Sequence, residues 1–159
     1  MELKLGKSEN SLIVTSYDSN DIDKVRFVRE IGIDKDIRKF VSPEIENYLM
    51  RPTYTDGIEN SVAYMVKDKD KIIGFFKPSM YYGTDIGIDY GIHPNYRRCG
   101  YGSRMLIEIS DYFFERNIKS VTLCIDNSNI PSINTAIAAG FKKENVGYQM
   151  ITEYVKRVK

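Results

Sequence analysis

A loop over residues 96–103 carries the residue types that bind phosphate, and it lies between an apolar, strand-like run and an amphipathic run. The N-terminus of a helix leaves backbone N–H groups unpaired and carries partial positive charge. Gly100 and Gly102 allow that terminus to approach an anion closely. Arg97 and Arg98 add mobile positive charge. The spacing therefore predicts a site for a diphosphate.

Other phosphate-binding motifs do not fit this loop. The chain holds no GxxxxGK[ST] string, and Met105 stands where a dinucleotide fingerprint needs its third glycine. The alternative interpretation is a tight strand-to-helix turn whose two glycines bind nothing.

Hydrophobic periodicity and turn residues predict the elements that position this loop. In the first half of the chain we expect a strand over 11–17, a helix over 18–31, further helix over 34–51 broken near Ser42–Pro43, and a hairpin of 61–68 and 71–78. Around the loop we expect a strand over 84–93 and a helix over 102–117. A strand over 120–125, a short helix over 131–139 that ends before Gly140, and one or two strands over 141–155 should follow. The helix between the strands Thr84–His93 and Val121–Ile125 forms a crossover, so those strands should be parallel neighbours. The order predicts an α/β protein with a mixed sheet.

Composition limits the class of protein. The chain has 159 residues and a formal net charge of +1, which predicts a single domain over 1–159 without an overall field for nucleic acid. Cys99 and Cys124 form no metal-spaced pair and His93 is the sole histidine, so we expect no metal site. No segment resembles a secretory signal or the roughly 20 apolar residues of a membrane span, so we expect a cytoplasmic protein without membrane contact.

The residues around the loop match a known motif. Arg97, Gly100 and Gly102 fill an R/Q-x-x-G-x-G/A pattern, and Ile92 and Pro94 fill the hydrophobic-x-Pro that precedes it. This region resembles the GNAT superfamily of acetyl-CoA-dependent N-acetyltransferases.

A second match lies downstream, where Asn129–Phe141 resembles the family's N-x-x-[AS]-I segment followed by a helix and Gly-Phe. Together the matches cover about Ser61–Phe141, and they are most similar to ribosomal-protein and small-amine acetyltransferases. The resemblance implies a central mixed, mostly antiparallel sheet with two splayed parallel strands and flanking helices.

The resemblance also implies how the co-substrate, acetyl-CoA, is held. Backbone amides of the loop would bind its pyrophosphate, and its pantetheine arm would run between the splayed strands. Ile92 would bond to the arm and Asn129 would contact it from the other side. His93 could by type be a general base, but its position before Pro94 at the strand end indicates a surface or cofactor-side residue instead, and Tyr101 is expected to pack on or cover the cofactor. The expected cofactor-binding residues are Ile92, His93, Arg97, Arg98, Cys99, Gly100, Tyr101, Gly102, Ser103 and Asn129.

Acyl transfer to an amine needs a proton acceptor, and strand alternation indicates one. Successive side chains point to opposite faces, so Asp89 and its flanking glycines share a small polar face, while Tyr90 lies on the apolar one. Asp89 could receive the amine proton or bind a cationic acceptor. The alternative is that this face meets solvent and Asp89 is simply hydrated, and a bulge would instead put Tyr90 in the cleft.

The proton donor for the leaving thiolate is less defined. Many family members carry a tyrosine where this chain has Ala136. Ser132 and Tyr148 are therefore candidate catalytic residues; the alternatives are a helix cap for Ser132 and a core or rim aromatic for Tyr148. We expect Cys124 to be a small core residue. The loops 48–60 and 79–85 are expected to form the acceptor pocket.

The sequence thus predicts an N-acetyltransferase that moves the acetyl group from acetyl-CoA to a primary amine by direct transfer in a ternary complex. The acceptor would be a small-molecule amine or a protein N-terminus. Members of the family are often dimers, so a homodimer is one expectation. The alternatives are a non-catalytic CoA-binding sensor or interaction module and, more remotely, a small nucleotide-binding protein.

Overall fold

The computed structural model describes residues 2–51, 53–55, 58–61, 63–146 and 150–159. Its main element is an eight-stranded sheet with the spatial order β1 (Glu2–Lys4), β2 (Ile13–Ser16), β5 (Tyr64–Asp68), β6 (Lys71–Tyr82), β7 (Asp85–Ile92), β8 (Ser120–Asp126), β10 (Ile151–Arg157) and β9 (Lys142–Val146). A separate hairpin pairs β3 (Thr53–Thr55) with β4 (Ile58–Ser61). The described part of the main sheet is antiparallel except between β7 and β8. The expected mixed α/β fold is confirmed.

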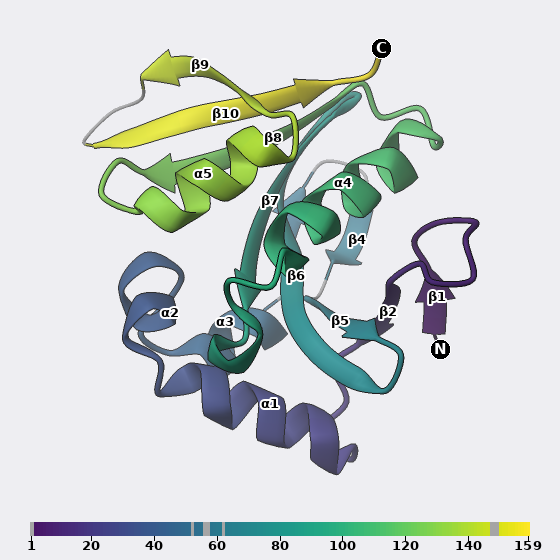
Figure 1. The fold of residues 1–159 in the computed structure, drawn as a ribbon, viewed down its shortest axis with the longest axis vertical. Helices are drawn as coiled ribbons and strands as arrows, with labels where there is room; N and C mark the ends of the chain where they lie inside the picture. The colour runs from purple at the N-terminus through teal and green to yellow at the C-terminus, as the bar shows by residue number, and fades with distance from the viewer. Residues whose placement is uncertain (1, 52, 56–57, 62, 147–149) are drawn as a thin grey trace.

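Helices cover both faces of the sheet (Figure 1). They are α1 (Ile22–Gly32), α2 (Lys35–Phe40), α3 (Ile45–Met50), α4 (Tyr101–Phe114) and α5 (Ile130–Ala138), with a 3₁₀ turn, η1 (Pro94–Tyr96). The core beneath α4 and α5 includes Ile88 and Met105, and the core beneath α1–α3 includes Leu49. Phe75 and Phe76 are neighbours on β6 but belong to opposite cores, because side chains alternate along a strand.

Local signals set the helix ends near the site. Asp21 caps α1 by accepting from the amides of its first turn, and Asp34 caps α2 by accepting from the Ile37 amide. The break expected at Ser42–Pro43 is confirmed, because α2 ends at Phe40 and α3 begins at Ile45. Gly140 has φ +91°, the left-handed conformation expected of a residue that ends a helix.

Strands β7 and β8 are parallel and then separate. Their ladder joins only Asp85–Gly87 to Ser120–Thr122. In Figure 1 the two strands begin together and then part, with β8 running toward α5. Helix α4 is the crossover between them, as expected. The separation leaves the inner edges of both strands open over their C-terminal halves.

Some elements differ from the expectation. The segment 79–85 was expected to be a loop, but β6 runs on to Tyr82 with a register shift between Pro78 and Met80, because proline cannot donate to a ladder. The short strand β1 and the β3–β4 hairpin were also not predicted. Tyr148 lies outside the described residues. No helix in the described ranges is long and apolar enough to cross a membrane.

Candidate active site

The loop before α4 presents backbone to open space. Gly100 is the N-terminal cap of α4 with φ +80°, and no heavy atom beyond its own residue and its chain neighbours lies within 4 Å of the position that a Cβ would take. Arg98 has φ +61° and is exposed, as is Cys99. The hydroxyl of Ser103 donates to the Gly100 carbonyl at 3.2 Å. The amides of the first turn of α4 have no intrahelical acceptor, so this surface can bind an anion.

The second glycine of the loop has a packing role. A Cβ at Gly102 would lie 2.8 Å from Cγ2 of Thr135 on α5. The missing side chain therefore lets α4 and α5 approach closely. The sequence predicts that both glycines leave room for a diphosphate. In the structure, open space lies beside Gly100, whereas Gly102 packs against Thr135.

Arg97 is not the mobile charge that the sequence predicted. Its guanidinium donates to both carboxylate oxygens of Asp34, at 3.1 and 2.8 Å, and its Nε donates to the Ile92 carbonyl at 3.1 Å. Burial opposes ionisation of Asp34, but the hydrogen bonds from Arg97 and from the Ile37 amide outweigh it and lower the pKa of the carboxyl. Arg97 thus ties the loop to the cap of α2.

The backbone of Ile92 faces the gap left by β8. His93 donates its amide to the Ile73 carbonyl of β6, so the N–H and C=O of Ile92 must point to the opposite side of the strand. Arg97 donates a hydrogen bond to the Ile92 carbonyl, whereas the Ile92 amide faces the gap. The orientation suits the backbone bond to a pantetheine arm that the resemblance implies.

His93 and Tyr101 contact protein groups. The imidazole of His93 is 5% exposed; its Nε2 lies 2.5 Å from Glu30 of α1 and its Nδ1 accepts from the Asn95 amide. His93 is therefore not a surface residue, because α1 packs over the end of β7, and its place among the cofactor-binding residues stays a prediction. The hydroxyl of Tyr101 donates to Asp68 at 2.7 Å, which ties α4 to the β5–β6 turn.

A cavity of about 180 Å³ lies between the separated halves of β7 and β8. It brings together three residues that the sequence singled out: Asp89 from β7, Asn129 from the cap of α5 and Ser132 from its first turn. Its full lining is Phe40, Val41, Ile88, Asp89, Tyr90, Leu123, Cys124, Ile125, Asp126, Asn129 and Ser132.

Asp89 belongs to a covered polar cluster. The hydroxyl of Tyr48, on α3, donates to its carboxylate. Lys77 stands opposite Asp89 in the β6–β7 ladder, is 3% exposed, donates to the Tyr48 carbonyl and lies 4.3 Å from the centre of the Tyr48 ring. The idea that this face meets solvent is wrong, because α3 covers it. Sequence reasoning placed Tyr48 in the expected acceptor-pocket segment 48–60 but did not pair it with Asp89, and it missed Lys77, because these contacts span segments far apart in the chain.

Burial dominates the titration of this cluster. It raises the pKa of Asp89, although the Tyr48 hydrogen bond and the Lys77 charge oppose the shift. It also raises the pKa of Tyr48 and lowers that of Lys77. A carboxylate with a raised pKa is a stronger base than a solvated one.

Tyr90 enters the same cavity from the opposite face of β7. Its ring packs against the core beneath α4 and α5, and its hydroxyl lies 2.8 Å from the Ser132 hydroxyl. Burial raises its pKa, while hydrogen bonds to Ser132 and Thr135 oppose the shift. The cap of α5 is Asn129, whose side chain accepts from the Ser132 amide at 3.4 Å. The Ser132 side chain is therefore not the cap of its helix.

Cys124 was expected to be a core residue, and this expectation is wrong. The thiol is exposed and lines the cavity. Cys124 lies on the face of the sheet that α1–α3 cover. Among the described residues, the strand residues of the core on that face belong to β5 and β6, so this core does not extend over β8. Partial burial first, and then the charges of Glu153 and Asp89, raise the pKa of the thiol.

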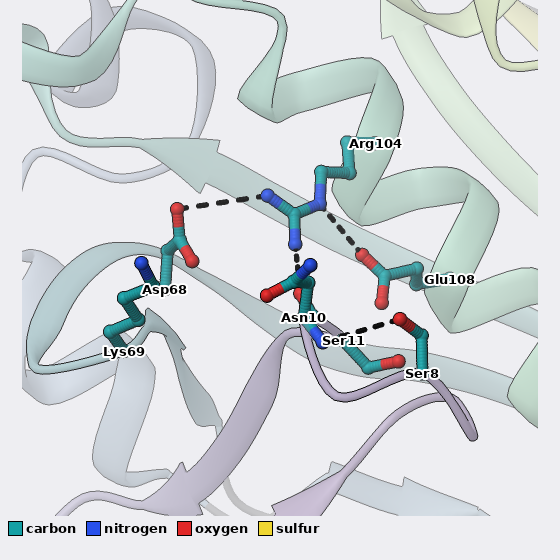
Figure 2. A pocket seen from close by; sticks show the side chains of 7 residues that line it. All are labelled: Ser8, Asn10, Ser11, Asp68, Lys69, Arg104 and Glu108. Atoms are coloured by element: carbon teal, nitrogen blue, oxygen red, sulfur yellow. Dashed lines mark hydrogen bonds and ion pairs between the residues drawn. The ribbon is translucent and has the colours of Figure 1, made fainter.

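A larger hollow of about 700 Å³ lies beside α4 (Figure 2). Arg104 is its centre: the guanidinium contacts Glu108 at 3.1 Å, Asp68 at 3.6 Å and the Asn10 carbonyl. The remaining lining residues are Ser8, Ser11 and Lys69. Its charges neutralise one another, and it lies apart from the gap between β7 and β8.

Comparison with known proteins gives one family and several similar structures. The model of the acetyltransferase (GNAT) family matches residues 30–141, and no curated protein matches the chain by sequence. A candidate ribosomal-protein-serine acetyltransferase from Vibrio cholerae is similar with a TM-score of 0.70 and 16% identity over 98% of both chains. A GNAT-family acetyltransferase from Bacillus anthracis has a TM-score of 0.69 and 19% identity over 94% of both chains. An aminoglycoside acetyltransferase, AAC(6')-Ib, in complex with coenzyme A and kanamycin has a TM-score of 0.70 and 13% identity, covering 92% of this chain and 95% of that one.

These solved structures share the overall fold of this chain. The family match extends over more than half of the chain, and the chain belongs to the acetyltransferase (GNAT) family. It is an acyltransferase that takes acetyl-CoA as its co-substrate. The open space before Gly100 and the first-turn amides of α4 fit a diphosphate.

Proposed function

We propose that this acetyltransferase acetylates a primary amine by direct transfer within a ternary complex. The observation that carries the proposal is the cavity between β7 and β8, where the Asp89 carboxylate faces the gap that a pantetheine arm would enter. Both substrates can meet there without an acetylated enzyme.

The charge of the cavity supports an amine acceptor. Two carboxylates, Asp89 and Asp126, line it, and none of its described lining residues is Lys, Arg or His. Hydrogen bonds from the Ser128 hydroxyl and amide lower the pKa of Asp126, so this group stays ionised. A cationic amine would be attracted to the cavity and would then have to lose a proton.

Asp89 is placed to take that proton. A protonated amine has no lone pair for attack on a carbonyl carbon, so a base must act first. Burial raises the pKa of Asp89 toward the range in which a carboxylate accepts a proton effectively. Tyr48 holds the carboxylate by a hydrogen bond, and Lys77 stands opposite Asp89 in the β6–β7 ladder.

The thiols support direct transfer. Cys99 is exposed in the loop that we propose binds the diphosphate, and it would then lie far along the co-substrate from its thioester. Cys124 does line the cavity, but its raised pKa keeps it as the poorly nucleophilic thiol. Two unpaired thiols also suit a reducing compartment, so we place the protein in the cytoplasm.

The size of the cavity limits the acceptor. Its volume of about 180 Å³ is about six times the ~30 Å³ that a water molecule occupies in the liquid. It has room for an acetyl group and the amine end of an acceptor, and the rest of the acceptor must lie outside. We therefore expect an amine on a slender stem, either in a small molecule or at a protein N-terminus.

Release of the CoA thiol from acetyl-CoA tests the proposal. The acceptors are polyamines, amino acids, peptides with a free or blocked N-terminus, and aminoglycosides, with a control that lacks acceptor. We expect release with at least one unblocked primary amine and none with its blocked form. Acetyl-CoA binding without release on any amine would favour the CoA-binding sensor instead.

A further inference from the structure

Breaking a thioester leaves a negative charge on sulfur, and the cavity must supply a proton to it. A donor must line the cavity and carry a transferable proton. Asp89 faces the cavity from the α3 side and already receives a hydrogen bond from Tyr48. On the side of α4 and α5, the lining residues with transferable protons are Tyr90 and Ser132.

Tyr90 and Ser132 act as a pair. Their hydroxyl oxygens lie 2.8 Å apart, across the junction between β7 and the first turn of α5. Thr135, the next hydroxyl on the helix, donates to the Pro131 carbonyl at 2.8 Å. Ala136 is fully buried and carries only a methyl group. The hydroxyl protons available on this side therefore belong to Tyr90 and Ser132.

The two hydroxyls differ in acidity. A phenol, with an ordinary pKa of about 10, is a stronger acid than an alcohol and is close in acidity to a thiol. Burial raises the pKa of Tyr90, which keeps the phenol protonated through neutral pH. Cys124 and Asp126 also line the cavity, but they lie on the face of β8 that points away from α4 and α5, because Leu123 and Ile125 occupy the other face.

We propose that Tyr90 is the catalytic acid that protonates the leaving thiolate, and that Ser132 positions its hydroxyl and returns a proton to it. This inference rests on the proposed function. It moves the acid from the helix position where Ala136 stands to the neighbouring strand. Tyr90 and Asp89 then serve the two proton transfers from opposite faces of β7.

The step balances as follows. Asp89 takes one proton from the ammonium nitrogen, whose freed lone pair forms the bond to the acetyl carbon, and the nitrogen then loses its second proton to solvent. The carbon–sulfur bond then breaks and its electron pair stays on sulfur, which receives the Tyr90 proton. Ser132 passes a proton from solvent to the phenolate, and Asp89 releases its proton to solvent. The products are the amide and the free thiol of CoA.

Titration of bound coenzyme A tests this assignment without an amine acceptor. The thiolate absorbs in the ultraviolet, so its pKa can be followed in complexes with the wild type, Tyr90→Phe and Tyr112→Phe. Tyr112 is the matched control, since it lies on α4 and does not line the cavity. A phenol that donates to the thiolate should lower the thiol pKa by about one unit in the wild type and Tyr112→Phe relative to Tyr90→Phe. Equal values in all three would overturn the assignment.

Steady-state kinetics give the second readout. We expect Tyr90→Phe to lower kcat by about 100-fold with little change in KM for acetyl-CoA, and Ser132→Ala to lower it less. Replacement of Tyr90 by a fluorotyrosine, a stronger acid, should shift the alkaline limb of kcat to lower pH. An unchanged kcat in Tyr90→Phe would refute the role of Tyr90, whereas a wild type that does not bind coenzyme A would refute the proposed function itself.

Discussion

The loop before α4 and the cavity between β7 and β8 are built in opposite ways. The loop uses backbone amides and a left-handed glycine from one short segment, so its chemistry depends on local conformation. The cavity uses side chains from α2, β7, β8 and α5, and its base is held by α3 and β6. A motif can therefore reveal the loop, whereas the cavity exists only once the sheet has formed.

The two regions also differ in what surrounds their charged side chains. In the loop, Arg97 is neutralised by Asp34 and acts as a brace between the loop and α2, so the proposed contact with an anion falls to the first-turn amides of α4. In the cavity, burial disfavours the charge of Asp89 and raises its pKa, and Lys77 stands opposite it in the β6–β7 ladder. Four substitutions separate these roles, from the largest expected effect to the smallest.

Asp89→Asn should have the largest effect, because it removes the proposed base. We expect kcat to fall by about 100-fold with little change in KM for acetyl-CoA. The raised pKa means that the carboxyl is protonated and inactive below that pKa, so wild-type kcat should rise as pH increases through it. The variant should lack this limb in a pH series of kcat; a limb of equal height in both proteins would remove Asp89 from the mechanism.

Gly102→Ala tests whether the second glycine serves packing. Its Cβ would lie 2.8 Å from Thr135 Cγ2, and such overpacking costs about 1–3 kcal/mol of unfolding free energy. Thr135→Ser deletes that methyl group and should restore most of the loss in a double-mutant cycle followed by urea unfolding.

The restored double variant also separates packing from cofactor binding. We expect it to bind acetyl-CoA within about three-fold of wild type, which is under 1 kcal/mol. A folded double variant that binds far more weakly would show that Gly102 faces the diphosphate after all, and would return both glycines to the same role.

Arg97→Gln removes the brace and should lower the unfolding free energy by about 1–2 kcal/mol at neutral pH. The pKa of Asp34 is lowered in the folded state, so this contribution is present above its unfolded value and is lost as pH falls through the folded value. The stability difference between Arg97→Gln and wild type should therefore shrink in acid denaturation series. A difference that does not depend on pH would mean that the ion pair with Asp34 is not its source.

Cys124→Ser should have the smallest effect, with turnover within about two-fold of wild type, because direct transfer needs no thiol nucleophile. Cys99→Ser is the matched control in the loop. Mass spectrometry after rapid mixing with acetyl-CoA should detect no acetylated enzyme in the wild type. A covalent acetyl group that is lost in Cys124→Ser would replace direct transfer with a two-step mechanism.

The sequence by itself determined the local features of the protein. The periodic runs, the break near Ser42–Pro43 and the glycine-rich segment before α4 depend on neighbours in the chain, and the structure has helices, a break and a helix start in these places. The crossover through α4 also followed from element order, since a parallel pair needs such a connection.

The tertiary structure decided which side chains meet. Arg97 and Asp34 are 63 residues apart in the chain, and so are His93 and Glu30. The surroundings of Asp89 depend on α3, and the hydroxyl pair of Tyr90 and Ser132 spans 42 residues. Hydrophobic pattern fixes the face on which a side chain lies, but only the packing of separate elements sets its partner, its burial and hence its pKa. The motif of the loop before α4 and the candidates Asp89 and Ser132 could therefore be found in the sequence, while the partners Tyr48, Lys77 and Tyr90 were set by the fold.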